Sequence, residues 1–217
     1  LQAVAAAGIG PIVLACQPEA ELLVTHFIGG SPWQAADAAR PANLRRLAQQ
    51  LRRLHALPPP AGCASVDFTR QALELEAVVA GNEAQLVRLR EAAVPRIARL
   101  AAREPWEVLC HNDLHHLNLL DDGDRLWLVD WEYGGRGNPL FDVASFLALH
   151  DLGPAATEAF LESYGRLRPA DRSHLGDARR LFDYVQWLWY RSRFPEPAGD
   201  EAWYAERLAQ RLLRCNN

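Results

Sequence analysis

The feature that most constrains the fold is a short polar turn between two apolar runs in the middle of the chain. Residues 118–120 and 126–129 are mainly apolar, and the segment DDGDR between them contains an Asp-Gly pair. Such a pair favours the tight turn of a β-hairpin. A turn centred on Asp124 places Asn118 opposite Asp130 at the open end, where paired Cα atoms lie about 4.5 to 5.5 Å apart.

The open end of this hairpin is suited to a metal ion. Carboxylate and amide oxygens are ligands of Mg²⁺, which keeps water and substrate phosphate oxygens in its other positions. Asp113, five residues before Asn118, lies in the polar segment CHNDLHHLNLL and can accept a proton from an attacking hydroxyl. The segment therefore predicts phosphoryl transfer, with Asn118 and Asp130 as metal ligands.

Two other interpretations of the same segment stay open. His and Asp at short spacing can also bind Zn²⁺, so a metal-dependent hydrolase is one alternative. Its ligands would be His111, Asp113, His115 and His116. The segment could instead only hydrogen-bond a buried loop, because Asp in loops commonly forms Asx-turns.

The rest of the sequence predicts a short β-rich start followed by helices. Residues 1–7 resemble the end of a helix closed by glycine. Apolar runs at 12–16 and 22–28 predict a first hairpin, and the segment GGSP at 29–32 predicts a hinge after it. Spacings of three and four and proline positions then predict helices. These cover 41–57, 68–102 with an interruption near Pro95, 138–150, 154–168, 171–194 and 201–214.

Composition excludes several classes of protein. The net charge is −4 with both signs mixed along the chain, so no basic stripe for nucleic acid is expected. No apolar run reaches the roughly 18 residues of a membrane span. The four cysteines are scattered, which favours a reduced, cytoplasmic setting and a small-molecule partner. The oligomeric state is not predicted. There is no Met, so Leu1 is not the expected natural start and we expect a piece of a longer protein.

The motifs resemble those of a known enzyme family. His111-x-Asp113, four further residues and Asn118, followed by a strand and Asp130, is the phosphoryl-transfer pattern of protein kinases. Asp130 precedes WEY rather than Phe-Gly, which resembles the aminoglycoside phosphotransferase and choline kinase family. The segments LVDWEYGG and NPLFDVASF resemble further motifs of that family in the same order. The likeness covers roughly residues 12–194 and is detailed over 109–146.

The resemblance implies an α+β, protein-kinase-like fold. A mostly helical C-terminal catalytic lobe at 31–217 would contain a short catalytic β-hairpin, and residues 1–30 would be a remnant of the β-rich N-terminal nucleotide lobe with its hinge. It also implies an ATP-dependent, Mg²⁺-dependent phosphotransferase. The acceptor would be an alcohol group of a small cationic metabolite, with choline or ethanolamine the first choice and thiamine the next.

The resemblance also implies residue roles. Asp113 is similar to the catalytic base, His111 to the residue that braces the catalytic loop, and Asn118 and Asp130 to the Mg²⁺ ligands. Asp142 resembles a helix-borne carboxylate that caps backbone amides of that loop. The backbone of His26, Phe27 and Ile28 would face the adenine of ATP.

The acceptor site is expected to combine aromatic and acidic side chains. Trp189 and Tyr133 resemble positions that enclose a quaternary ammonium in choline kinases. Asp183 and Trp187 share a helix face next to that of Trp189, and Glu132 adds a carboxylate beside Tyr133. Aromatic stripes at helical spacing also form cores, and Leu149 or His150 stands where choline kinases place an acidic residue.

One departure from the family pattern concerns ATP binding. Family members carry a glycine-rich strand turn and a basic residue, usually Lys, before the first hairpin, whereas this chain has neither and all of its 23 basic residues are Arg. A pseudokinase or binding module that lacks the ATP lobe is therefore a further alternative.

Overall fold

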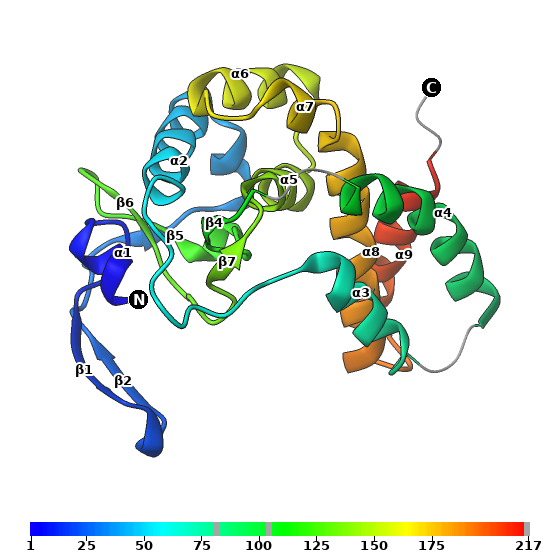
Figure 1. Ribbon diagram of the computed structural model, residues 1–217, viewed down its shortest axis with the longest axis horizontal. Helices are drawn as coiled ribbons and strands as arrows, with labels where there is room; N and C mark the ends of the chain where they lie inside the picture. The colour runs from blue at the N-terminus through cyan, green and yellow to red at the C-terminus, as the bar shows by residue number, and fades with distance from the viewer. Residues whose placement is uncertain (80–82, 103–105, 215–217) are drawn as a thin grey trace. The chain divides into compact units, whose positions relative to one another are not determined.

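The computed structural model describes residues 1–79, 83–102 and 106–214. These residues form two compact units, each built from two separate stretches of chain (Figure 1). The first unit takes residues 1–66 and 106–167, and the second takes the described residues of 67–105 and 168–217.

Helices dominate both units, and all strands in the described parts lie in the first unit. The predicted α+β class is thereby confirmed. The expected boundary after residue 30 lies inside the first unit, so the division into residues 1–30 and 31–217 stays a prediction about lobe identity.

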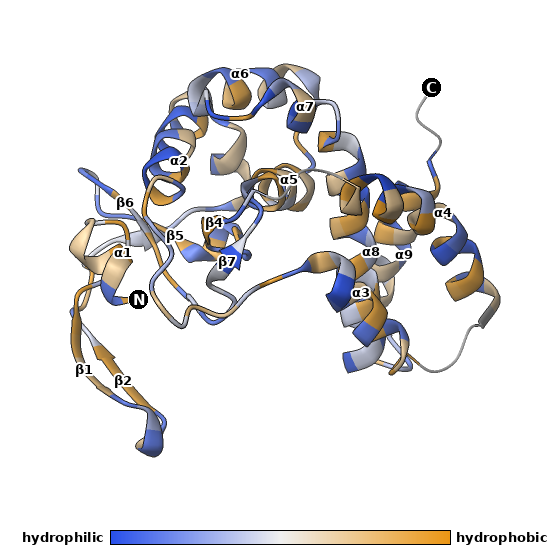
Figure 2. Ribbon diagram, in the orientation of Figure 1, coloured by the Kyte–Doolittle hydropathy of each residue, from blue (hydrophilic) through white to orange (hydrophobic). Residues whose placement is uncertain are grey.

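The chain begins with a short helix and an antiparallel hairpin. Helix α1 (Gln2–Ala6) ends before Gly8, whose φ of +64° is a left-handed conformation that glycine adopts without strain. Strands β1 (Val13–Gln17) and β2 (Leu22–Thr25) pair around the 3₁₀ turn η1 (Pro18–Ala20), as predicted. Figure 2 shows apolar colour along both strands, whose side chains are largely exposed.

The second predicted hairpin belongs to a three-stranded sheet in the same unit. Its strands, in spatial order, are β3 (Ser31–Pro32), β5 (Leu119–Asp121) and β6 (Leu126–Leu128). The 3₁₀ turn η3 (His116–Asn118) leads directly into β5. Leu119, Leu126 and Leu128 are buried, so this hairpin contributes to the core.

The register of this hairpin differs by one residue from the prediction. Leu119 pairs with Leu128, and Val129 donates its amide to the Asn118 carbonyl at 3.0 Å, so Asn118 does not oppose Asp130. The reason lies in the turn, where the Asp122 carboxylate accepts the amides of Asp124 and Arg125. These hydrogen bonds centre the turn between residues 123 and 124. Val129 therefore lies opposite Asn118, and Asp130 lies one residue beyond that pair.

The remaining elements of the first unit surround this sheet. Helix α5 is buried along almost its whole length, and α2, whose buried residues include Leu47 and Leu51, packs against α6. Strand β4 pairs with β7 and delivers the chain to the polar segment. Their bounds, with the 3₁₀ helix η2, are η2 (Ala35–Ala39), α2 (Pro41–Leu54), β4 (Val108–Cys110), β7 (Gly135–Gly137), α5 (Pro139–Leu149) and α6 (Pro154–Tyr164).

The second unit is helical in its described parts. Helix α8 packs against α3, α4 and α9. The bounds are α3 (Phe68–Glu76), α4 (Glu83–Ala101), α7 (Pro169–Arg172), α8 (Leu175–Arg193) and α9 (Gly199–Leu213). None of the helices in the described ranges of either unit is long and apolar enough to cross a membrane.

Two predicted helices end at other places than expected. The stretch 68–102 was expected to break near Pro95, but α4 runs through Pro95 and the helix ends instead after Glu76. Proline removes a backbone donor from a helix, here the one that would bond the Glu91 carbonyl four residues earlier, and α4 nevertheless continues across it. The stretch 171–194 is likewise two helices, because α7 ends at Arg172 and α8 begins at Leu175.

Candidate active site

The polar segment forms a buried loop between β4 and β5. Its first residues, His111 and Asn112, are 0% and 7% exposed. Asn112 has a φ of +66°, which a non-glycine residue adopts only where its surroundings hold it. A buried backbone at this point needs partners for its amides, and those partners come from helix α5.

Asp142 supplies these partners. It lies in the first turn of α5, which Asn138 caps by accepting the Leu140 amide at 2.9 Å. One Asp142 oxygen accepts the His111 amide at 2.9 Å, and the other accepts the Asn112 amide at 2.6 Å. Asp142 therefore holds the backbone just before Asp113, which is the geometry that the resemblance implies.

Electrostatics keep Asp142 ionised although it is fully buried. Burial alone raises the pKa of its carboxyl, but hydrogen bonds from His55 and from the loop amides outweigh this effect, so the pKa lies below its ordinary value. His55 Nε2 lies 2.9 Å from the Oδ2 oxygen of Asp142. A buried carboxylate with several donors is a rigid anchor, because each donor would be left unpaired if it moved.

His111 connects the loop to the end of strand β6. Its Nδ1 accepts the Asp113 amide at 3.3 Å, so its Nε2 donates to the Val129 carbonyl at 2.9 Å. Its ring lies 4.5 Å from that of Trp131, measured between centroids. Burial lowers the pKa of His111, so the ring is neutral at pH 7. The neutral ring ties Asp113 to the segment that carries Asp130.

Asp113 is half-buried and is held by Asn118. The Asn118 Nδ2 group donates to the Asp113 carboxylate at 2.8 Å and to its carbonyl at 3.0 Å. The pKa of Asp113 is raised, chiefly by burial and further by the charges of Asp130 and Glu132, against the opposing effects of His111 and Asn118. Asp130 and Glu132 thus lie close enough to act on Asp113, and a raised pKa strengthens a general base.

The donors around Asp113 fit a hard divalent cation. The Asn118 amide nitrogen is bonded to Asp113, which leaves its Oδ1 oxygen as the ligand that this side chain can offer. Asp130 is exposed and has a φ of +60°, so the backbone departs from the extended strand conformation at this residue, at the end of the hairpin. Amide and carboxylate oxygens beside further carboxylates are the oxygen donors that Mg²⁺ accepts.

Glu132 and Tyr133 lie next to this group and are exposed. The Tyr133 carbonyl accepts a hydrogen bond from Asn112 Nδ2 at 2.9 Å, which fixes the backbone of the expected acceptor segment to the loop. Asn112 was not predicted as a site residue. Its only signal in the sequence is its place between His111 and Asp113, because its partner is 21 residues away.

The other predicted acceptor residues belong to helix α8 of the second unit. Asp183 is 1% exposed and pairs with Arg211 of α9, with its Oδ2 3.6 Å from Arg180. Trp187 is also 1% exposed. Burial favours a packing role for both over contact with a substrate. Trp189 is half-exposed and stays a candidate.

The expected adenine segment follows strand β2. The His26 amide donates to the Ile12 carbonyl at 2.8 Å, and the Ile28 carbonyl accepts from Gly30 at 2.9 Å. Phe27 between them is 84% exposed. The His26 carbonyl, both backbone groups of Phe27 and the Ile28 amide are therefore left outside the backbone bonds of the hairpin and its turn among the described residues.

The hydrolase alternative finds no support in the described residues. The one group of three His, Cys, Asp or Glu side chains there with ligand atoms within 4.8 Å of one another is His55, Cys110 and Asp142, which shares nothing with the predicted zinc ligands. His115 instead stacks on His116 at 4.1 Å between centroids, and burial lowers the pKa of both rings.

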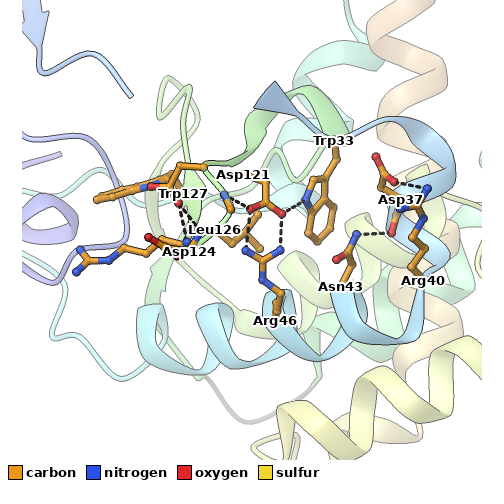
Figure 3. A network of polar contacts seen from close by, with 12 residues as sticks. Trp33, Asp37, Arg40, Asn43, Arg46, Asp121, Asp124, Leu126 and Trp127 are labelled. Atoms are coloured by element: carbon orange, nitrogen blue, oxygen red, sulfur yellow. Dashed lines mark hydrogen bonds and ion pairs between the residues drawn. The ribbon is translucent and has the colours of Figure 1, made fainter. Parts of the chain in front are cut away.

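The hairpin β5–β6 is anchored at its turn by helix α2 (Figure 3). Figure 3 shows the Arg46 guanidinium facing the Asp121 carboxylate, with the Trp33 indole on its other side. Arg46 lowers the pKa of Asp121 to about 2, chiefly through this hydrogen-bonded pair. Gln50 of the same helix donates to the Leu126 carbonyl at 2.7 Å. None of these anchors was predicted, because they join segments about 75 residues apart.

Comparison with known proteins agrees with this geometry. The model of the family described as "Phosphotransferase enzyme family" matches residues 1–176. Protein LicA of Haemophilus influenzae is 46% identical over 55 residues, which is 25% of this chain and 21% of that protein. The chain thus matches about a fifth of the length of this curated relative.

Solved structures extend the likeness over the fold. A choline/ethanolamine kinase family protein from Mesorhizobium loti superposes with a TM-score of 0.82 at 26% identity, over 97% of this chain and 75% of that one. Choline kinase LicA from Streptococcus pneumoniae superposes with a TM-score of 0.81 at 20% identity, over 98% of this chain and 77% of that one. The predicted kinase-like fold is thereby confirmed.

Proposed function

We propose, because this chain belongs to the phosphotransferase enzyme family, that it transfers the γ-phosphoryl group of ATP to a hydroxyl of a small cationic metabolite. One observation supports the proposal. Asn118 holds the Asp113 carboxylate at 2.8 Å, and the charge of Asp130 raises the pKa of Asp113. The proposed base is thus bonded to one proposed oxygen ligand and is affected by the charge of the other.

Asp113 has the properties of the general base. Its carboxylate accepts the proton of the acceptor hydroxyl as the acceptor oxygen bonds to the γ-phosphorus, and the bond from that phosphorus to the ADP oxygen breaks. Asn118 and His111 fix the position of Asp113 from two sides. Positioning matters here because phosphoryl transfer needs little covalent chemistry from the protein.

Asn118 and Asp130 are the residues that we propose as holders of Mg²⁺. When bound, Mg²⁺ offsets negative charge on the phosphates of ATP. For the adenine, we propose the backbone of His26, Phe27 and Ile28, whose groups include the His26 carbonyl and the Ile28 amide that the hairpin and its turn leave unused.

The acceptor side favours a single positive charge. Glu132 is exposed beside the exposed ring of Tyr133, and the Asn112 side chain holds the Tyr133 backbone. A cation over an aromatic ring gains about 0.5 to 2 kcal/mol. We propose choline or ethanolamine as first-choice acceptors and thiamine as the next.

The test is ADP release from Mg²⁺-ATP with choline, ethanolamine, thiamine or an aminoglycoside supplied separately. We expect turnover with one acceptor, and Asp113→Asn should lower it by about 10² to 10⁴-fold while nucleotide binding is kept. The control is Asp124→Asn, the same change on the exposed hairpin turn, which should keep full activity. Full turnover by Asp113→Asn would contradict the assignment.

Two further outcomes separate the alternatives. Failure to bind Mg²⁺-nucleotide would favour the pseudokinase or binding module, for which the lack of Lys in the chain is the supporting observation. Stoichiometric zinc in the purified protein, with ATP-independent hydrolysis, would favour the hydrolase instead.

A further inference from the structure

Three buried polar side chains lie behind the catalytic loop in the core of the first unit. His55 follows the last turn of α2, Tyr164 ends α6, and Asp142 begins α5. Their exposed fractions are 2%, 0% and 0%. His55 Nδ1 lies 2.7 Å from the Tyr164 hydroxyl, and His55 Nε2 lies 2.9 Å from Asp142. The proposed reaction uses neither His55 nor Tyr164.

The direction of these hydrogen bonds follows from Asp142. An ionised carboxylate can only accept, so His55 carries a proton on Nε2 and donates it to Asp142. Tyr164 keeps its proton, because burial raises the pKa of its phenol, and its hydroxyl can donate to His55 Nδ1. The result is a chain of donors that runs from Tyr164 through His55 to Asp142.

This chain ends on the oxygen that holds the catalytic loop. Oδ2 of Asp142 accepts from His55 at 2.9 Å and from the His111 amide at the same distance. Oδ1 accepts the Asn112 amide at 2.6 Å. Any rotation of the carboxylate would therefore break a bond to His55 and release two loop amides together.

We propose that His55, oriented by Tyr164, is a positioning residue that acts through Asp142 on the catalytic loop. His55 fixes the carboxylate so that its two oxygens meet the amides of His111 and Asn112. Asn112 has a left-handed backbone that persists only when its surroundings determine it. Asp113 is the next residue, so its carboxylate depends on the same anchor.

A purely packing role for His55 predicts something different. His55 is 2% exposed and also lies beside the buried Cys110, whose Sγ is within 4.8 Å of a His55 ring nitrogen, so an apolar side chain of similar size would fill the space. A packing residue would then affect stability alone. A positioning residue affects the loop itself, and its effect depends on Asp142.

The first test measures the loop without relying on any activity. Amide hydrogen exchange of residues 110–113 is compared in wild type, His55→Leu, His55→Gln and Tyr164→Phe. We expect His55→Leu to speed exchange at least about 10-fold, as the two amides lose a fixed acceptor. Gln keeps one donor and one acceptor, so His55→Gln should restore most of the protection, and Tyr164→Phe should give an intermediate value.

The matched control is Phe160→Leu. Phe160 is 0% exposed, lies one turn before Tyr164 on α6 and has no bond to Asp142. Phe160→Leu should lower the melting temperature as much as the His55 variants do, without changing amide hydrogen exchange in residues 110–113. Equal exchange in Phe160→Leu and His55→Leu would overturn the proposal, because stability loss alone would then explain the effect.

The second test uses kinetics and rests on the proposed function. Loss of an outer partner of a site typically costs about 10 to 100-fold, so His55→Leu should lower kcat by that factor with an unchanged KM for Mg²⁺-ATP. In an Asp142→Asn background the same change should add little, since His55 acts through that carboxylate. Losses that multiply would overturn the proposal. If wild type has no turnover while the exchange result holds, the kinase proposal fails and the positioning role stands.

Discussion

The hairpins β1–β2 and β5–β6 are both antiparallel pairs closed by short turns, yet they bury their apolar side chains to different extents. Leu14, Leu22 and Leu23 of the first are 62%, 45% and 54% exposed. Leu119 and Leu128 of the second are 0% exposed. Both hairpins have the same antiparallel pairing, so the difference in burial comes from the segments that surround each hairpin.

The hairpin β5–β6 is held on both of its strands at the turn end. Arg46 binds the Asp121 carboxylate and Gln50 binds the Leu126 carbonyl, and both come from helix α2. An isolated two-stranded hairpin is marginally stable in water, so such anchors decide whether it keeps one position. The anchored hairpin β5–β6 can hold Asp130, which follows it, in one position. The first hairpin has no comparable anchors among the described residues.

The largest test of this contrast is loss of a core side chain. Leu128→Ala should lower the free energy of unfolding by about 2 to 5 kcal/mol, because it removes a fully buried Leu and leaves a cavity. The matched Leu14→Ala change on the first hairpin should cost under about 0.5 kcal/mol. Urea denaturation of both variants measures the difference, and equal losses would refute the contrast.

The next test removes the anchor on α2. Arg46→Leu leaves the Asp121 carboxylate without its guanidinium partner and should cost about 1.5 to 3 kcal/mol, the range for hydrogen bonds to charged groups. Arg45→Leu is the control, since Arg45 is the exposed neighbour on the same helix. The contrast is wrong if both variants unfold at the same urea concentration.

A smaller effect follows from the titration of Asp121. Its pKa of about 2 lies below the ordinary 3.8, so the pair with Arg46 stabilises the fold above about pH 4 and this stability is lost as the pH falls through about 2. Asp121→Asn should therefore be less stable than wild type by about 1 kcal/mol at pH 7. The gap should close toward pH 2 in acid titrations followed by circular dichroism, and a gap that is constant with pH would contradict this origin.

The smallest effect concerns the exposed hairpin. Leu22→Ser should change the free energy of unfolding by under about 0.5 kcal/mol, because the side chain is already largely in water. It should also reduce self-association measured by light scattering, since exposed apolar strands promote contact between chains. If the free energy of unfolding fell by more than about 2 kcal/mol, Leu22 would be buried in the folded protein, against this prediction.

The two hairpins also mark what local sequence can predict. The Asp-Gly turn predicted the hairpin β5–β6, and the short spacing predicted Asp113 on the loop that leads to Asn118, where the structure joins the two side chains at 2.8 Å. These interactions span few residues, so their geometry is local. The register was wrong by one residue because the Asp122 side chain caps its own turn, a choice that the spacing of apolar residues does not reveal.

Longer-range features escaped prediction for a physical reason. His55 and Tyr164 are 109 residues apart, and each lies on a helix whose apolar spacing predicts only a packed face. Their meeting depends on how α2 and α6 pack, which composition and periodicity leave undetermined. A lone His at the end of an apolar stripe was the one available signal. At Pro95 the sequence predicted a break that the structure does not have. Helix α4, which packs against α8 and α9, continues across this proline.

The division of each unit into two stretches has a consequence for synthesis on the ribosome. Helix α4 ends at residue 101, but its partner α8 begins at residue 175. At roughly 5 to 20 residues per second, synthesis takes about 4 to 15 s to pass from the end of α4 to the start of α8. During that interval the apolar side of α4, including Leu89 and Ala93, lacks α8 and α9, against which α4 packs in the described part of the folded unit. The apolar side of α4 therefore stays uncovered in the nascent second unit until α8 has been made.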